Sequence, residues 1–169
     1  MERGVWGLKR AQEAAARVLA DPKLVAVLLR ALFSDDADLR WRASDTARRV
    51  AEKLPALLGP HADDILGLFS ESGEDNWRTR AHLGLVVARI AHSRPLRMRA
   101  AGLLLPLSYD SSNIIRCAAI EGLGLLAKRE PVLRSQVDPL LEEALATGTL
   151  AMKNRAEHAL ARLYAKHRA

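Results

Sequence analysis

The sequence of 169 residues has a single cysteine, few aromatic residues and no long apolar run. Cys117 cannot form an internal disulfide, and a zinc site would have to rely on histidine, aspartate and glutamate alone. No segment approaches the ~20 apolar residues that span a bilayer, and residues 1–10 lack the apolar core of a secretory signal. These absences predict a cytoplasmic protein with no membrane association.

Motifs of the common enzyme classes are also missing. The chain contains no HExxH, GxxxxGK[ST], GxSxG or paired-cysteine metal motif. His61, followed by Asp63 and Asp64, is more typical of a helix start than of a cation site. Gly122 and Gly124 follow no strand and lie within a helical pattern, so they predict close helix packing rather than a phosphate loop. We expect no enzyme activity, no cofactor and no metal.

Helix-forming residues dominate what is present. Alanine and leucine occur 29 times each, whereas valine, isoleucine and threonine together occur 18 times. This balance favours helix over sheet. The sequence therefore predicts an all-α protein.

A unit of 35 to 39 residues recurs along the chain. Prolines precede or open four apolar helical stretches: Pro22, Pro60, Pro95 and Pro131. Arginines at similar spacing are each followed within two residues by alanine: Arg42, Arg80, Arg116 and Arg155. Six residues before the arginines, a polar residue lies in a turn-rich segment: Asp36, Glu74, Asp110 and Thr149.

This periodicity predicts four pairs of antiparallel helices in one domain spanning residues 1–169. The expected helices are 22–33 and 38–54, 61–70 and 76–92, 96–107 and 112–129, and 132–146 and 150–167, after a lone helix near 5–20. The corresponding units are a half-repeat, 1–20, and repeats at about 21–59, 60–94, 95–130 and 131–169.

These helical pairs resemble the HEAT repeat over nearly the whole chain. The best matches are Asp110 to Lys128 (DSSNIIRCAAIEGLGLLAK) and Asn76 to Ala91 (NWRTRAHLGLVVARIA). The resemblance implies a right-handed α-solenoid, in which the second helix of each repeat lines a concave surface. It also implies a structural ladder of turn acids and helix arginines between neighbouring repeats. The predicted ladder residues are Asp36, Arg42, Glu74, Arg80, Asp110, Arg116 and Arg155, with Thr149 departing from the acidic pattern.

The second helices of the two central repeats are apolar nearly all round, which predicts burial on both sides. Either neighbouring helices cover them, or the concave surface carries an apolar strip that a partner covers. The residues assigned to such a strip are Leu83, Val86, Ile90 and Ile120. Its guest would be an amphipathic helix or an extended apolar peptide, with Trp41 and Trp77 as anchors. The rim charges would be Arg40, Arg48, Arg78 and Arg89. The alternative is that both tryptophans plug the ends of the interhelical core.

The predicted function is that of a noncatalytic binding or scaffold module with a protein or peptide partner. The alternative is nucleic-acid binding, because the net charge is +6. Some HEAT-like proteins are DNA glycosylases, and Trp41 and Asp45 fit that description loosely, although Arg48 and Arg49 make a surface ion pair the simpler role of Asp45. The basic surplus is spread along the chain, which favours the protein partner. We expect a monomer or a weak homodimer.

Overall fold

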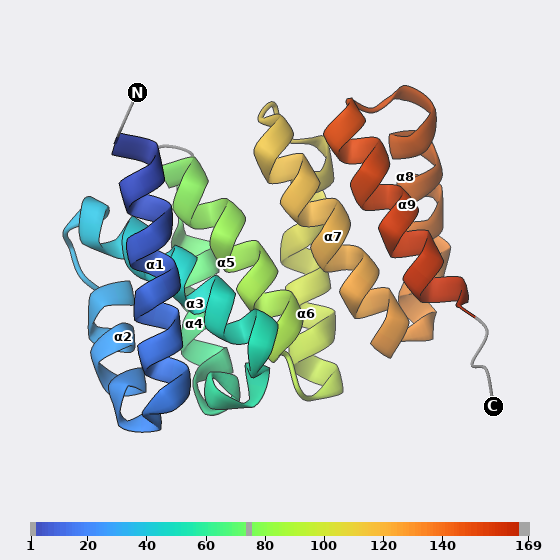
Figure 1. Cartoon of the computed structure of the whole chain (residues 1–169). Helices are drawn as coiled ribbons and strands as arrows, with labels where there is room; N and C mark the ends of the chain where they lie inside the picture. Colours follow the sequence, from blue (N-terminus) through green and yellow to red (C-terminus); the bar gives the residue numbers. More distant parts are fainter. Residues whose placement is uncertain (1–2, 74–75, 166–169) are drawn as a thin grey trace.

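The computed structural model describes residues 3–73 and 76–165, and within these ranges it contains nine α-helices and no strand. Five helices form the first layer: α1 (Arg3–Ala20), α3 (Ala37–Lys53), α5 (Trp77–Ile90), α7 (Asn113–Arg129) and α9 (Leu150–Tyr164). Four helices form the second layer: α2 (Val25–Leu32), α4 (Ala62–Glu71), α6 (Arg94–Leu104) and α8 (Arg134–Thr147). The chain therefore alternates between the layers, as Figure 1 shows.

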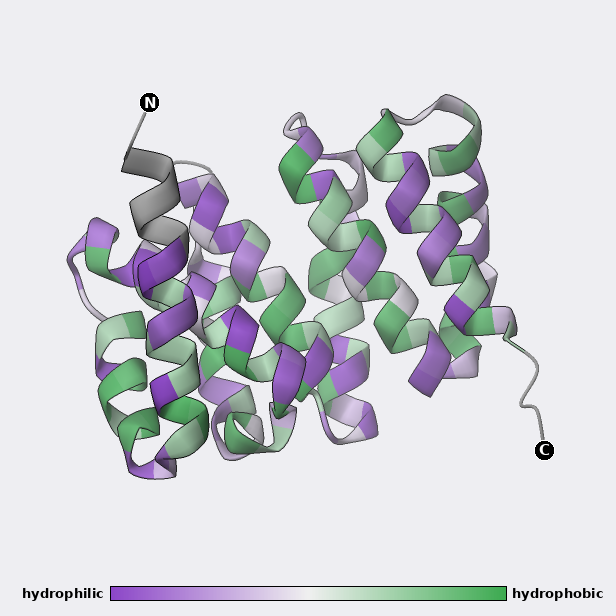
Figure 2. Cartoon of the chain, in the orientation of Figure 1, coloured by the Kyte–Doolittle hydropathy of each residue, from purple (hydrophilic) through white to green (hydrophobic). Residues whose placement is uncertain are grey.

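The helices of the first layer pack in sequence order. Helix α1 lies against α3, α3 against α5, α5 against α7, and α7 against α9. Each second-layer helix packs against the first-layer helix that follows it in the chain. Hydrophilic and hydrophobic residues alternate along each helix, so apolar side chains reach neighbours while polar side chains reach the surface (Figure 2).

Local sequence explains where the helices begin. The Asp36 carboxylate accepts the backbone N–H groups of Asp38 and Leu39, at 2.9 and 3.1 Å, and thereby caps α3. Ser93 caps α6 and Thr149 caps α9 in the same manner. The four recurring prolines lie in short 3₁₀ turns or in the first turn of α6, as predicted. All nine predicted helices are present, with ends displaced by at most three residues.

Small residues bring the first-layer helices close together. A Cβ placed on Gly124 would lie only 2.6 Å from the Cβ of Ala159 on α9. A Cβ on Gly122 would lie 3.3 Å from the Cβ of Ala88 and 3.5 Å from the carbonyl oxygen of Gly84, both on α5. The prediction that these glycines permit close helix packing is confirmed.

Of the two alternatives for the central helices, burial by neighbouring helices is confirmed and the apolar strip is wrong. Its members are fully buried, with at most 1% of each residue exposed: Leu83, Val86, Ile90 and Ile120. Helix α5 has α3 and α7 on its two sides and α4 and α6 behind it, so three of its faces are covered. Ordinary burial by neighbouring helices therefore explains why α5 and α7 are apolar nearly all round.

Within the described part of the chain, none of the helices is both long and apolar enough to span a bilayer.

Candidate functional site

A groove of about 920 Å³ runs across the first layer and is lined by all five of its helices, from Ala11 on α1 to Arg155 on α9. Charged residues supply much of its lining: Arg42, Asp45, Arg48, Glu52, Arg78, Arg89, Glu121 and Arg155. A volume of this size is within the usual range of ligand sites. The groove is therefore the candidate functional site.

At one end of the groove, an arginine stacks on two tryptophans. The Arg78 guanidinium carbon lies 5.2 Å from the ring centre of Trp41 and 4.8 Å from that of Trp77. These distances are typical of cation–π contacts. Trp41 is half-buried, Trp77 is exposed, and both line the groove. The predicted binding residues Trp41, Trp77, Arg78 and Arg48 thus share one surface, whereas the four apolar residues predicted with them lie in the core.

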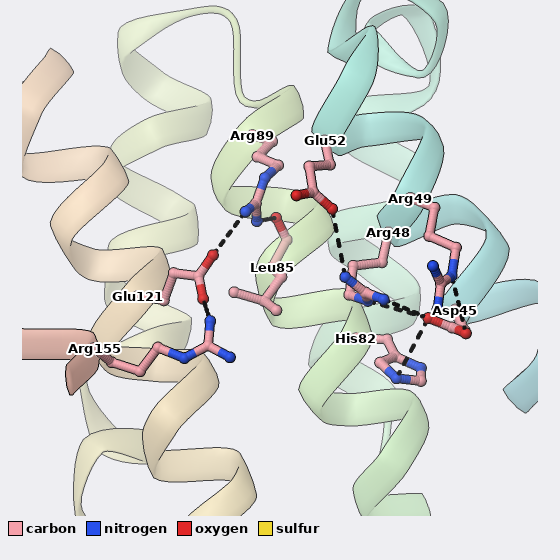
Figure 3. Close-up of polar contacts among 9 residues, drawn as sticks. All are labelled: Asp45, Arg48, Arg49, Glu52, His82, Leu85, Arg89, Glu121 and Arg155. Carbon is pink, nitrogen blue, oxygen red and sulfur yellow. Dashed lines mark hydrogen bonds and ion pairs between the residues drawn. The ribbon is translucent and has the colours of Figure 1, made fainter. Parts of the chain in front are cut away.

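The middle of the groove contains an ion-pair cluster around Asp45 on α3 (Figure 3). Arg48 donates to one carboxylate oxygen at 2.8 and 3.1 Å, and Arg49 donates to the other at 3.3 Å. Only 12% of the Asp45 side chain is exposed. Burial alone would raise the pKa of this carboxyl, but the hydrogen bond and charge of Arg48, with the charges of His82 and Arg49, hold the pKa below its ordinary value. Asp45 is therefore a fixed anion.

His82 on α5 connects this cluster to Ser44 on α3. Its Nδ1 lies 2.9 Å from the Ser44 Oγ, and its Nε2 lies 3.9 Å from the Asp45 carboxylate. Burial lowers the pKa of His82 to about 4, although Asp45 opposes the shift, so the imidazole is neutral near pH 7.

Ser44, His82 and Asp45 are the residue types of a catalytic triad, but here the serine hydroxyl is not accessible to a substrate. Ser44 is fully buried, and its hydroxyl donates to the Trp41 carbonyl oxygen at 2.7 Å. With its proton committed there, the Ser44 oxygen accepts from the imidazole rather than giving a proton to it. These contacts hold α3 against α5.

A second cluster joins three helices around Glu121 on α7 (Figure 3). Arg89 on α5 donates to one carboxylate oxygen at 2.7 Å, and Arg155 on α9 donates to the other. Arg89 also donates to the Leu85 carbonyl oxygen at 3.0 Å. Burial would raise the pKa of Glu121, but the hydrogen bond of Arg89 and the charges of Arg155 and Arg89 lower it below the ordinary value.

The predicted ladder residues have several different roles. Arg80 on α5 pairs with Asp110, in the turn before α7, at 3.7 Å, which is the kind of contact that a ladder predicts. Arg116, however, donates to Asn113 in its own helix. The remaining members are placed as follows: Asp36 caps α3, Arg42 lines the groove, Arg155 binds Glu121 rather than its own turn, and Glu74 lies outside the described residues.

Glu121 is one of the groove residues that the sequence analysis missed, as are Glu52, His82 and Ile114. Its partners Arg89 and Arg155 lie 32 and 34 residues away. These separations are close to the repeat length. Opposite charges about one repeat apart in the sequence are therefore the signal that identifies these ion pairs.

The described residues give little support for a metal site or for a reactive cysteine. The described residues include no group of three or more histidine, cysteine, aspartate or glutamate side chains arranged to hold a metal ion. Asp63, near His61, pairs with Arg99 at 2.8 Å. Cys117 lines the groove, and burial raises the pKa of its thiol, which lowers the thiolate fraction at neutral pH.

The arrangement thus offers an aromatic and cationic end, together with carboxylates that are held by arginines. Comparisons of the chain with protein-family models, with curated proteins and with solved structures found no match.

Proposed function

We propose that this chain is a noncatalytic binding module whose groove holds a segment of another protein. The observation that carries the proposal is the groove itself, which crosses five helices and gathers Trp41, Trp77 and Arg78 at one end. Tryptophan and arginine contribute strongly to binding at protein interfaces. Stacking between two indoles also restricts Arg78 before any partner arrives, which reduces the entropy cost of binding.

The proposed architecture is a right-handed HEAT-like α-solenoid of about four repeats. Its support is the alternation of the chain between two layers, with first-layer helices packing in sequence order. The contact of Arg80 with Asp110 across neighbouring repeats adds to this support. In such arrays each repeat contacts only its neighbours, and the stacked second helices present a continuous surface to a partner.

Binding explains the groove better than catalysis does. Both oxygens of Asp45 and both oxygens of Glu121 are engaged by arginines. His82, which is the histidine in the groove lining, contacts buried Ser44. General acid–base chemistry needs a group that can reach a substrate proton, and these groups are instead committed to contacts within α3 or between neighbouring helices.

Selection from a displayed library of random peptides tests this proposal. The wild-type chain, immobilised, should enrich peptides that bind with a saturable isotherm. Trp77→Ala should weaken an enriched peptide about tenfold or more, because Trp77 lines the groove and truncation of an interface tryptophan commonly has this effect. Tyr109→Ala is the matched control, because this exposed tyrosine is not part of the groove lining. Failure to enrich any peptide, or equal weakening by both variants, would overturn the proposal.

Nucleic-acid binding is the second candidate, because Trp41, Trp77 and Asp45 share the groove with Arg78. Aromatic side chains and arginines also stack on bases and bind phosphates. A glycosylase role for Asp45 would require a carboxylate that is free to approach a base, whereas Arg48 and Arg49 engage both of its oxygens. Fluorescence anisotropy of labelled duplex DNA, from about 50 to 200 mM salt, tests this candidate. Absence of binding at the low-salt end would eliminate it.

A further inference from the structure

The two buried acids of the groove are less exposed than their arginine partners. The carboxylates of Asp45 and Glu121 are 12% and 9% exposed. Their partners Arg48 and Arg155 are more exposed, and Arg155 reaches 49%. The third acid, Glu52, is 51% exposed and pairs with Arg48. Apart from Glu52, the exposed charges of the groove lining are therefore guanidinium groups.

Two further arginines, Arg42 and Arg78, belong to the groove lining. Among the described residues, no carboxylate lies within 4 Å of the guanidinium of Arg42 or Arg78. The Arg78 guanidinium lies over the rings of Trp41 and Trp77, and cation–π contacts of this kind do not use up its N–H donors. A planar fork of this kind matches a carboxylate in bidentate geometry.

An apolar ledge adjoins this pair of arginines. Trp77 and Ile114 are both exposed, and both line the groove and a smaller neighbouring pocket of about 270 Å³. They belong to the first turns of α5 and α7. The same end of the groove thus offers guanidinium donors and an apolar surface side by side.

We infer, resting on the proposed function, that the segment bound in the groove is acidic. Asp or Glu side chains of the partner bind Arg78 and Arg42, and an adjacent apolar side chain packs on Trp77 and Ile114. The groove is open across five helices, so an internal segment of the partner can cross it without ending there. Charge complementarity at the two arginines determines which segments bind, while the apolar contact adds affinity by burying apolar surface.

A protein segment fits these charges better than a nucleic acid does. The lining contains five arginines and three carboxylates, and the Glu52 side chain is 51% exposed. A phosphate backbone would approach this exposed carboxylate and the recessed ones, and it requires cations along its whole path. The guanidinium groups that pair with no carboxylate among residues 3–73 and 76–165 are instead those of Arg42 on α3 and Arg78 on α5, which suits one or two carboxylates.

Two displayed peptide libraries, identical except that one encodes Asn and Gln wherever the other encodes Asp and Glu, test the inference on the full chain. The acidic library should yield peptides with a carboxylate next to an apolar residue, and the amide library should yield none of comparable affinity. Measured by anisotropy of a labelled peptide from the acidic library, Arg78→Gln and Arg42→Gln should each weaken binding about tenfold, since a charge-assisted hydrogen bond is lost. Arg30→Gln, which removes the same charge from α2, should change the affinity by less than about twofold.

A double-mutant cycle sharpens this result. Replacing the carboxylate of the enriched peptide by an amide should weaken binding about tenfold with the wild-type chain and much less with Arg78→Gln, because the two groups act as a pair. Additive losses would overturn the inference. Circular dichroism of each variant establishes that the fold is retained.

Three outcomes separate the inference from the function on which it rests. Equal enrichment from both libraries would overturn the acidic partner and leave the peptide-binding groove intact. Enrichment from neither library would overturn both. Tighter binding of labelled duplex DNA than of any peptide, with the same dependence on Arg78, would overturn the protein partner in favour of a nucleic acid.

Discussion

Replacing Gly124 by alanine should destabilise this protein even though alanine is the better helix former. The added Cβ would lie 2.6 Å from the Cβ of Ala159 and 3.5 Å from its Cα. Carbon atoms normally approach to about 3.5–4.0 Å. The Ala159 Cβ is fixed to its helix and cannot rotate away, so α7 and α9 must separate by about 1 Å at this point.

The magnitude follows from two opposing effects. Overpacking of a well-packed interface costs about 1–3 kcal/mol, and replacing glycine by alanine inside a helix returns about 1 kcal/mol. We therefore expect Gly124→Ala to lower the free energy of unfolding by up to about 2 kcal/mol. Gly102→Ala in α6 isolates the second effect, because nothing lies within 4 Å of its added Cβ. That control should raise the free energy of unfolding by about 0.5–1 kcal/mol.

Urea denaturation followed by far-UV circular dichroism measures both changes. The double variant Gly124→Ala/Ala159→Gly, which keeps one methyl group at the contact, should recover most of the loss. If Gly124→Ala stabilises the chain as much as Gly102→Ala does, the close approach of α7 and α9 is not a feature of the molecule.

Three further predictions concern buried groups. Glu121→Gln should cost about 1–3 kcal/mol, because Arg89 loses its buried partner, whereas exposed Glu157→Gln should cost almost nothing. Because the pKa of Glu121 is lowered in the folded protein, its stabilisation is present above pH 4.5 and should disappear as the pH falls below that value, which urea titrations at several pH values measure. The pKa of His82 is lowered from 6.5 to about 4, so wild-type stability should fall by about 2–3 kcal/mol as the pH drops across that window, and His82→Gln should remove this slope. Leu83→Asp should unfold the chain and not merely abolish binding, since it buries a charge, and loss of helical circular dichroism is the readout.

Much of the fold was predictable from the sequence because its signals are local. Proline, turn residues and apolar spacing each act over a few residues, so they indicated where helices such as α5 and α7 begin and end. The close contacts of Gly122 and Gly124 were predictable for a similar reason, since a glycine inside a helical pattern usually has a packing role.

The candidate site was less predictable because its contacts join different repeats. An apolar helix surface indicates burial but does not say what covers it, which is why Leu83 and Ile90 were assigned to a partner surface although neighbouring helices cover them. The pairing of Glu121 with Arg89 and Arg155 depends on the rotation of three helices about their axes, and no local pattern specifies that rotation. Trp41, Trp77 and Arg78 were found because tryptophan and arginine are common in interface hot spots, and the two tryptophans recur near the starts of successive first-layer helices.

The small residues at the contacts between α5, α7 and α9 affect the groove as well as the core. Where neighbouring helices meet through glycine and alanine, a single methyl group determines the distance between their axes. Arg155 lies on α9 and Arg78 on α5, and both line the groove. Each methyl group added or removed at these contacts therefore changes the distance between these two residues across the groove. Groove width can thus be tuned by substitutions that never touch a bound segment, and related chains could diverge in specificity through alanine and glycine exchanges hidden between helices.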